Sequence, residues 1–297
     1  MRWSLLLLVG ACHAQISDGG IDGGGSNVET DATDSGSPVD AAGVTLGPWS
    51  PPIMFGGAAT ATAEDDATLA WTENELVFAK NDGATKHLYT MSRADAASPF
   101  GLPTLVPFSA AADRQEQSPR FSSDNLTLYF ASNRGGNDDI WMVTRPSVGG
   151  AWGTPTRILN TATAATEKWY VPCDGDRYLM IRNIDGQGDI FEGVGTGTPT
   201  RVAELSSPVG ETGTFVTQDC LEVYFASVRD TTNDLWKSSR SSIAAPWSAP
   251  VKVTDFNTAT NNEQDPWMSA DGRTFIFASD ADGTDDSDIY ISTRSPI

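Results

Sequence analysis

Apolar and polar residues alternate in several stretches of the chain, and the same stretch returns at a spacing of roughly fifty residues. The clearest copy is LYFASNRGGNDDIWMVTR at residues 128–145, and VYFASVRDTTNDLWKSSR at residues 223–240 matches it in length and landmarks. Each copy has the period of two that strands show, with a turn of Gly, Asn and Asp between two such runs. Further copies begin at Leu76, Tyr178 and Phe275. The pattern therefore predicts five β-hairpins.

A glutamate opens one more predicted strand before each hairpin. These residues are Glu64, Glu116, Glu167, Glu211 and Glu263, with steps of 52, 51, 44 and 52 residues between them. A fourth strand follows each of the first four hairpins, and in three of these copies it carries an aromatic residue three places before a proline, as in WGTP at Trp152. Four strands at this period are typical of one blade of a β-propeller.

The two ends of the repeat region complement each other. The fifth hairpin is followed only by SPI, so its blade lacks an outer strand, whereas an outer-strand motif, WSPPIMF from Trp49 to Phe55, stands alone before the first glutamate. We therefore predict an all-β, five-bladed propeller of four-stranded blades, closed by Trp49 to Phe55, which completes the last blade and removes the open sheet edge. A solenoid is the alternative, but it leaves the Trp49 motif unexplained.

The repeat has the pattern Ser-Pro-x-Phe-Ser-x-Asp, then aromatic-Phe-Ala-Ser-x-Arg, then Asp-Ile-Trp, clearest from Ser118 to Trp141. This pattern resembles the WD40-like propeller repeat of the TolB type over about 250 residues. The resemblance implies a propeller in a bacterial envelope. It leaves partner and activity open, because one fold serves many functions.

The N-terminus reads as a targeting segment. MRWSLLLLVGAC, residues 1–12, has a basic start, a short apolar run and a small-residue site that ends in Cys12. It resembles the lipobox of bacterial lipoproteins, which implies lipidation at Cys12; an ordinary signal peptide is the alternative. Residues 13–48 are rich in Gly, Asp and Ser and predict a disordered acidic tether, with the propeller at 49–297. The expected location is the cell envelope, at the outer membrane.

The charge balance narrows the range of partners. The formal net charge is −20 and the pI about 4.2, which argues against nucleic acid as a partner. Nucleophilic catalysis has little support, since the histidines are His13 and His87 and no Gly-x-Ser-x-Gly occurs. We expect a monomeric, lipid-anchored, non-enzymatic binding or scaffold module for an envelope protein or a glycan. The alternative is a carbohydrate-binding or glycoside-cleaving propeller.

The repeated glutamates are the first candidate site. On a propeller, Glu64, Glu116, Glu167, Glu211 and Glu263 start the innermost strands around the axis, where a carboxylate ring could bind a hard cation or a basic side chain. The alternative is architectural, with each carboxylate hydrogen-bonded or paired with a basic residue. The available partners are Lys80, Arg134, Arg182 and Arg229.

Two tryptophans follow these glutamates on the inner strands. Trp169 and Trp267 stand two and four residues after their glutamates and could stack on a sugar in an axial funnel. Aromatic packing between blades is the alternative. A glycosidase needs two acids in distinct environments, whereas these five glutamates look equivalent, and equivalence favours an architectural role.

The turn DADGTDDSD has the carboxylate density of a calcium loop, through Asp280, Asp282 and Asp285. It lacks the glutamate that an EF-hand needs eleven places after its first ligand, because Ile291 stands there. A hairpin turn is therefore favoured, and calcium remains a weak candidate without any other cofactor.

Two cysteines occupy turns after the inner strands of neighbouring blades. Export favours a disulfide between Cys173 and Cys220. A separation of more than about 7 Å between the Cα atoms would forbid it, so the sequence leaves both states open.

Overall fold

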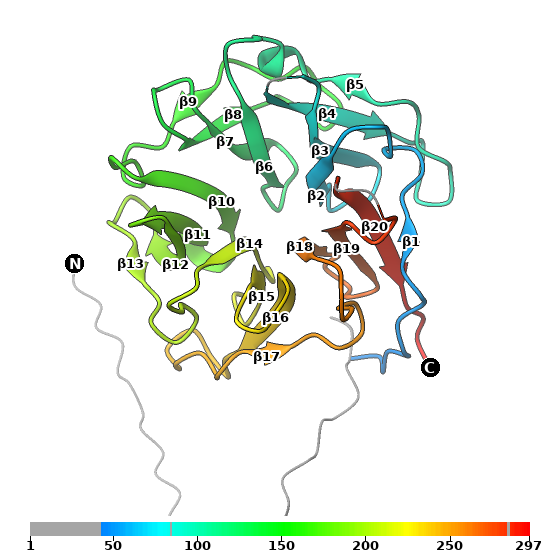
Figure 1. The fold of residues 1–297 in the computed structure, drawn as a ribbon. Coiled ribbons are helices and arrows are strands. Elements are labelled where there is room, and N and C mark those ends of the chain that lie inside the picture. The colour runs from blue at the N-terminus through cyan, green and yellow to red at the C-terminus, as the bar shows by residue number, and fades with distance from the viewer. Residues whose placement is uncertain (1–42, 84, 284–285) are drawn as a thin grey trace, which may run out of the picture. The chain divides into compact units, whose positions relative to one another are not determined.

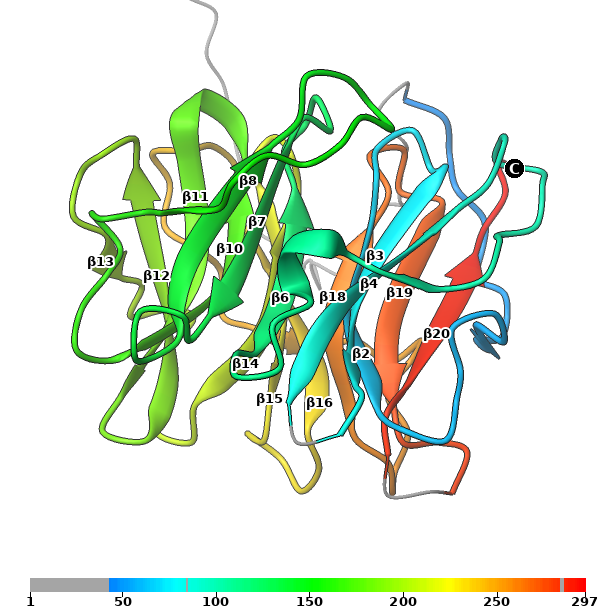
Figure 2. The ribbon, with the colours of Figure 1, turned by 90° about the horizontal axis from the view of Figure 1, so that it is seen from above.

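The computed structural model describes residues 43–83, 85–283 and 286–297. Five antiparallel sheets of four strands each surround a common axis, with β2, β6, β10, β14 and β18 innermost (Figure 1; Figure 2). The predicted five-bladed propeller is confirmed. Cys12 and most of the predicted tether lie outside the described residues. Within the described residues, no helix has the length and apolar character needed to cross a membrane.

Each blade runs from its inner to its outer strand in chain order, with one exception in the last blade. The first blade contains β2(Glu64–Leu69), β3(Glu75–Asn81), β4(Lys86–Ser92) and β5(Thr104–Leu105). The second contains β6(Glu116–Phe121), β7(Thr127–Ser132), β8(Asp139–Thr144) and β9(Thr156–Arg157). The third contains β10(Thr166–Pro172), β11(Arg177–Ile184), β12(Gln187–Val194) and β13(Thr200–Arg201). The fourth contains β14(Glu211–Val216), β15(Glu222–Ser227), β16(Asp234–Ser239) and β17(Val251–Lys252).

The last blade joins the two ends of the folded chain. It contains β18(Glu263–Met268), β19(Thr274–Ser279) and β20(Asp288–Thr293), and its outer strand is β1(Ile53–Met54). Ile53 pairs with Ile291, and the Ser50 amide donates to the Thr293 carbonyl at 2.8 Å. The predicted closure is confirmed, although regular pairing covers only two residues of the stretch from Trp49 to Phe55.

The folded part also extends upstream of Trp49. Leu46, which the sequence pattern assigned to the tether, is 2% exposed and forms a bridge with Pro296. The contacts between the two ends of the folded chain therefore extend a few residues upstream of the Trp49 motif.

A repeated contact between an arginine and an aromatic ring explains two landmarks of the sequence pattern. In four blades the arginine after the third strand lies over the aromatic ring of the outer-strand motif. The guanidinium carbon is 4.5, 4.3, 4.2 and 4.1 Å from the ring centroid in the pairs Arg93–Phe100, Arg145–Trp152, Arg240–Trp247 and Arg294–Trp49. A cation over an aromatic ring gains about 0.5–2 kcal/mol. The pair Arg294–Trp49 places this contact across the closure of the ring.

The third blade lacks this contact and has other connections. Gly195 stands at the position of the arginine, and Tyr178 stacks on Tyr170 with ring centroids 4.4 Å apart. Cys173 is disulfide-bonded to Cys220 of the fourth blade, with the Cα atoms 5.4 Å apart. This bond settles the alternative that the sequence left open and indicates an extracytoplasmic location.

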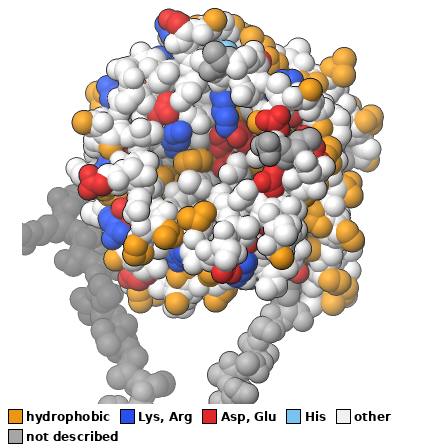
Figure 3. Space-filling view, viewed as in Figure 1, with side chains coloured by type: hydrophobic (Ala, Val, Ile, Leu, Met, Phe, Trp, Pro, Cys, Tyr) orange, Lys and Arg blue, Asp and Glu red, His pale blue; other side chains and the backbone are white. Residues whose placement is uncertain are grey.

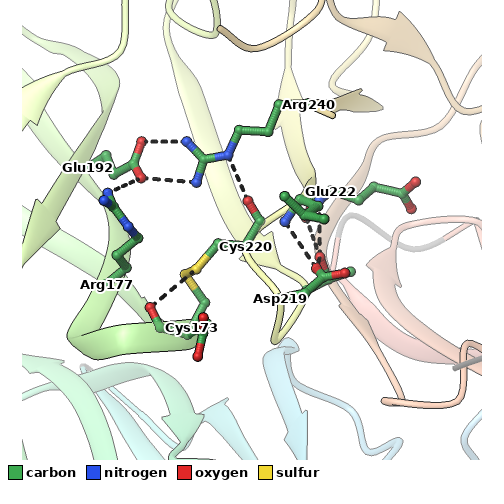
Figure 4. Close-up of a disulfide and its surroundings, with 10 residues drawn as sticks. Cys173, Arg177, Glu192, Asp219, Cys220, Glu222 and Arg240 are labelled. Carbon is green, nitrogen blue, oxygen red and sulfur yellow. Dashed lines mark hydrogen bonds and ion pairs between the residues drawn. A yellow bond between two sulfur atoms is a disulfide. The ribbon is translucent and has the colours of Figure 1, made fainter. Parts of the chain in front are cut away.

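Two ion pairs lie next to this disulfide, and one of them also joins the third and fourth blades. Figure 4 shows Glu192 of β12 between Arg177 and Arg240, with nitrogen to oxygen distances of 3.1 and 3.0 Å. Arg177 belongs to the same blade as Glu192, whereas Arg240 belongs to the fourth blade, so the disulfide and the Glu192–Arg240 ion pair connect the same two blades.

Candidate functional site

The same irregularity interrupts all five inner strands just after their glutamates. Counted from the glutamate as the first residue, the pairing register of every inner strand shifts between the second and the fifth residue. The third residue has a left-handed backbone, with φ between 49° and 56°, at Asp66, Ser118, Trp169, Gly213 and Asp265. Bulges of this kind re-aim a side chain and occur often next to functional sites.

Gly213 is required by the close approach of two bulges. A Cβ atom at this position would lie 2.6 Å from the Asp265 amide nitrogen and 2.8 Å from its Oδ1. The bulges of the fourth and fifth blades therefore meet near the axis, where only a residue without a side chain fits.

A cavity of about 470 Å³ opens at this end of the axis. The residues directly after the five glutamates all line it, and they differ from blade to blade: Asp65, Gln117, Lys168, Thr212 and Gln264. Asp66, Trp169, Asp265 and Lys86 also line it. On the face drawn in Figure 3, acidic and basic side chains lie together around the middle of the ring. We call this cavity the funnel.

Two aspartates and a tryptophan form the floor of the funnel. The Trp169 indole N–H donates to Asp66 Oδ1 at 2.6 Å and to Asp265 Oδ1 at 3.0 Å. Both aspartates are almost fully buried, at 2% and 3% exposed. Burial, together with the charges of Asp66 and Asp65, raises the pKa of Asp265 well above its ordinary value. The floor therefore favours a protonated Asp265 and strongly favours any added positive charge.

Lys86 neutralises a third carboxylate in the wall of the funnel. Its ammonium is hydrogen-bonded and ion-paired to Asp65 Oδ2, while Asp65 Oδ1 is buried without a hydrogen-bond partner. Burial and the neighbouring Asp66 raise the pKa of Asp65 to about 6, against the opposing effect of Lys86. This carboxylate thus keeps one acceptor atom unused.

A buried arginine closes the axis below the floor. Arg120 is 1% exposed, and its guanidinium donates to the carbonyls of Pro119 at 2.8 Å, Ala67 at 3.4 Å and Pro266 at 3.4 Å. These carbonyls belong to the inner strands of three blades. The axis is therefore filled at this level, and the funnel is a blind cavity.

The predicted glutamate ring lies beside the funnel. All five glutamates are at most 1% exposed, and Glu211 lines the cavity. Four have the basic partners considered in the sequence, with nitrogen to oxygen distances of 3.5, 2.7, 3.0 and 2.8 Å for Lys80–Glu64, Arg134–Glu116, Arg182–Glu167 and Arg229–Glu211. This arrangement favours the architectural alternative.

The fifth glutamate has no basic partner within the described part of the chain. Glu263 accepts hydrogen bonds from the Thr258 amide at 3.2 Å and hydroxyl at 3.0 Å. Burial raises the pKa of Glu263 to about 7, despite these bonds. The five glutamates are thus equivalent in position, but among the described residues four have a cationic partner and Glu263 has none.

The two predicted funnel tryptophans differ in placement. Trp169 lines the funnel, whereas Trp267 is 1% exposed and packs against Trp71 and Phe215, with centroids 5.8 and 6.3 Å away. The prediction that both are funnel aromatics is wrong for Trp267, because its position beyond the bulge directs it into the core.

The predicted calcium turn is only partly described. Asp280 accepts hydrogen bonds from the amide and side chain of Asn262, at 2.8 and 2.7 Å. Asp280 thus acts as a turn residue. Asp282 forms further interactions, and Asp285 lies outside the described residues.

The donors that suit a hard cation lie instead in the funnel. Asp65, Asp66 and Asp265 each offer one carboxylate oxygen, and these atoms lie within 4.8 Å of one another. Oxygen donors are what Ca²⁺ prefers, although Lys86 and Trp169 already contact the same carboxylates. The repeat pattern did not identify these aspartates. The feature of the sequence that could have identified them is the variation directly after the constant glutamate, which reads EDD, EQS, EKW, ETG and EQD in the five blades.

These features define a class: a five-bladed β-propeller with a blind, polar funnel on its axis. No protein-family model matches the sequence, and a search of curated proteins finds no match. The fold is similar to that of a TolB candidate from Agrobacterium tumefaciens, with a TM-score of 0.54 and 16% identity over 78% of this chain and 77% of that one. The chain thus has distant structural similarity to TolB propellers.

Two glycoside hydrolases show a comparable similarity. An endo-arabinase from Bacteroides thetaiotaomicron VPI-5482 has a TM-score of 0.52 and 13% identity, over 81% of this chain and 96% of that one. A family 117 glycoside hydrolase from Zobellia galactanivorans has a TM-score of 0.52 and 9% identity, over 84% and 89%. At these identities the similarities establish the fold alone.

Proposed function

We propose that the protein is a non-enzymatic binding module of the bacterial cell envelope, anchored through Cys12, that takes up a polar group of its partner in the funnel. One observation carries the proposal. Structurally equivalent positions of the five inner strands, all next to a bulge, carry Asp, Gln, Lys, Thr and Gln around one cavity. A purely architectural position has no reason to differ between blades.

The chemistry of the funnel suits recognition of a group that both donates and accepts hydrogen bonds. Lys168 and the side-chain amides of Gln117 and Gln264 line it as donors, and the carboxylate of Asp65 and the carbonyls of the same two amides line it as acceptors. The volume of about 470 Å³ is in the range of small-ligand sites. The rigid strands fix these groups before binding, which lowers the entropic cost of association.

A glycan is the second candidate ligand, because Trp169 and three aspartates line the same cavity. Glycoside cleavage is less well supported. Inverting enzymes separate their two carboxyl groups by about 6.5–9.5 Å and retaining enzymes by about 5–5.5 Å. The funnel carboxylates have oxygens within 4.8 Å of one another, and two of them share the Trp169 indole N–H. The two glycoside hydrolases share the fold, and their names say nothing of this funnel.

The full-length protein, immobilised, is exposed in parallel to envelope extract and to a glycan array. We expect a partner or glycan that the wild type retains and that Lys168→Ala fails to retain. Lys237→Ala, on β16 and outside the funnel, is the matched control and should retain it. Release of reducing sugar from an arrayed glycan would overturn the non-enzymatic proposal, and equal retention by both variants would remove the funnel as the binding site.

A further inference from the structure

A second cavity lies at the other end of the inner strands. It has a volume of about 400 Å³ and is lined by Trp71, Ser123, the segment 172–176 and Gln218. These residues belong to the turns that follow β2, β6, β10 and β14, so four successive blades contribute. The funnel lies at the starts of the same strands, and Arg120 and Trp267 fill the space between the two cavities.

Two aspartates in this cavity have no counter-charge. Asp174 and Asp176 are exposed, and none of the described lysines or arginines forms an ion pair with either one. The adjacent Arg177 is turned away to Glu192, at 3.1 Å. The two carboxylates are therefore available to a ligand, in a chain whose net charge of −20 attracts cations from a distance.

An aromatic wall stands beside these carboxylates. Trp71 is half-buried and is held in place by Trp267, whose ring centroid is 5.8 Å away, and by its amide bond to Asn125 Oδ1 at 2.9 Å. Trp71 lines the cavity, and its indole N–H is buried without a partner, so its side chain presents no hydrogen-bond donor there. A tryptophan face attracts cations, and it attracts planar ones by stacking as well.

The loop that carries the carboxylates is fixed in advance. Cys173 is disulfide-bonded to Cys220, and the Cys173 amide donates to the Arg177 carbonyl at 2.8 Å. Asp176 has a left-handed backbone, with φ of 61°, between these fixed points. Because this loop is already ordered, a ligand binds to it without the entropic cost of ordering it.

We propose that this cavity binds the guanidinium group of an arginine side chain from a protein partner. The lining is rich in acceptors, since among its side chains only Ser123 and Gln218 can donate from an accessible position. A guanidinium group has five donors and no acceptor, and it is planar, so it complements two carboxylates and a tryptophan face. A neutral sugar needs donors as well as acceptors and fits this lining less well. The site is on the opposite face from the funnel and does not depend on the proposed function.

The test titrates the full-length protein with three capped tripeptides: acetyl-Gly-Arg-Gly-amide, its lysine analogue, and its citrulline analogue, which has the shape of arginine without the charge. The readout is the NMR shift of the Trp71 indole N–H, assigned with Trp71→Phe. We expect saturable binding of the arginine peptide, weaker binding of the lysine peptide and none of the citrulline peptide. The variant Asp174→Asn with Asp176→Asn should weaken arginine binding at least tenfold.

The matched control removes two exposed aspartates elsewhere, by Asp113→Asn with Asp255→Asn, and should weaken binding less than twofold. Equal binding of the citrulline peptide would overturn the charge argument, and equal binding of the lysine peptide would overturn the assignment to guanidinium. A Trp71 signal that stays unchanged with all three peptides would overturn the site. Thermal unfolding of each variant confirms that it is folded before the titration is interpreted.

Discussion

The glutamates and the residues directly after them lie on the same five strands, yet they differ in kind. The glutamates are identical in every blade, are buried, and four of them are ion-paired within their own blade. Their neighbours, from Asp65 to Gln264, change from blade to blade and line an open cavity. Repetition at equivalent positions thus marks the residues that build the ring, and divergence marks those that we propose recognise a ligand.

The largest expected effect is on the glutamate layer. Glu116→Gln keeps the shape of the side chain but leaves Arg134, whose side chain is 9% exposed, without its counter-charge. Unpairing a buried charge costs about 3 kcal/mol. Urea unfolding should show this loss, while the capture of a funnel ligand stays unchanged. A loss of stability below about 1 kcal/mol would show that the layer is not structural.

The second-largest loss of stability is expected for a change in the wall of the funnel, outside the glutamate layer. Lys86→Met removes the ammonium that neutralises Asp65, beside Asp66 and Asp265. Because the lysine side chain is 29% exposed, we expect a loss of about 2 kcal/mol, less than for a fully buried pair. Added CaCl₂ should recover part of that loss if a hard cation can replace the ammonium. Thermal unfolding with CaCl₂ or with NaCl of equal ionic strength measures this.

Glu263 tests whether the glutamates are equivalent in charge. Its pKa is raised to about 7 by burial, so the folded state binds a proton more tightly than the unfolded state. Stability from this group is therefore full below about pH 4.5 and is lost as the pH rises through 7. Glu263→Gln should be close to wild type at pH 4.5 and more stable by about 1–2 kcal/mol at pH 8. Parallel pH profiles of stability for the two proteins would contradict a raised pKa at Glu263.

The smallest effect on stability is expected inside the funnel. Lys168→Ala removes an ion pair of 3.3 Å with Asp138, but Asp138 keeps hydrogen bonds of 3.1 and 3.0 Å from Gln115 and Gln117. The change in unfolding free energy should stay within about 0.5 kcal/mol, while ligand capture is lost. If capture and stability fall together, the funnel residues are architectural as well.

The repeat pattern predicted the fold in detail because each landmark has a local physical role. The arginine and the tryptophan recur since one stacks on the other, as in Arg240 and Trp247. The closing of the ring followed from Trp49, whose partner Arg294 lies at the far end of the sequence. The site was predicted less well, because the repeat marks only the glutamates, whereas Asp66 and Asp265 become neighbours through bulges that the pattern does not show.

The sequence by itself determined the number of blades, the strand order and the closure, since periods of two and of about fifty residues are properties of the chain. Tertiary structure alone decided what lies at the axis. The left-handed bulges turn Asp66, Trp169 and Asp265 toward one another, and the blade packing brings Cys173 within bonding distance of Cys220. The reason is that contacts across a ring depend on where five separate strands meet, and no stretch of sequence contains that information.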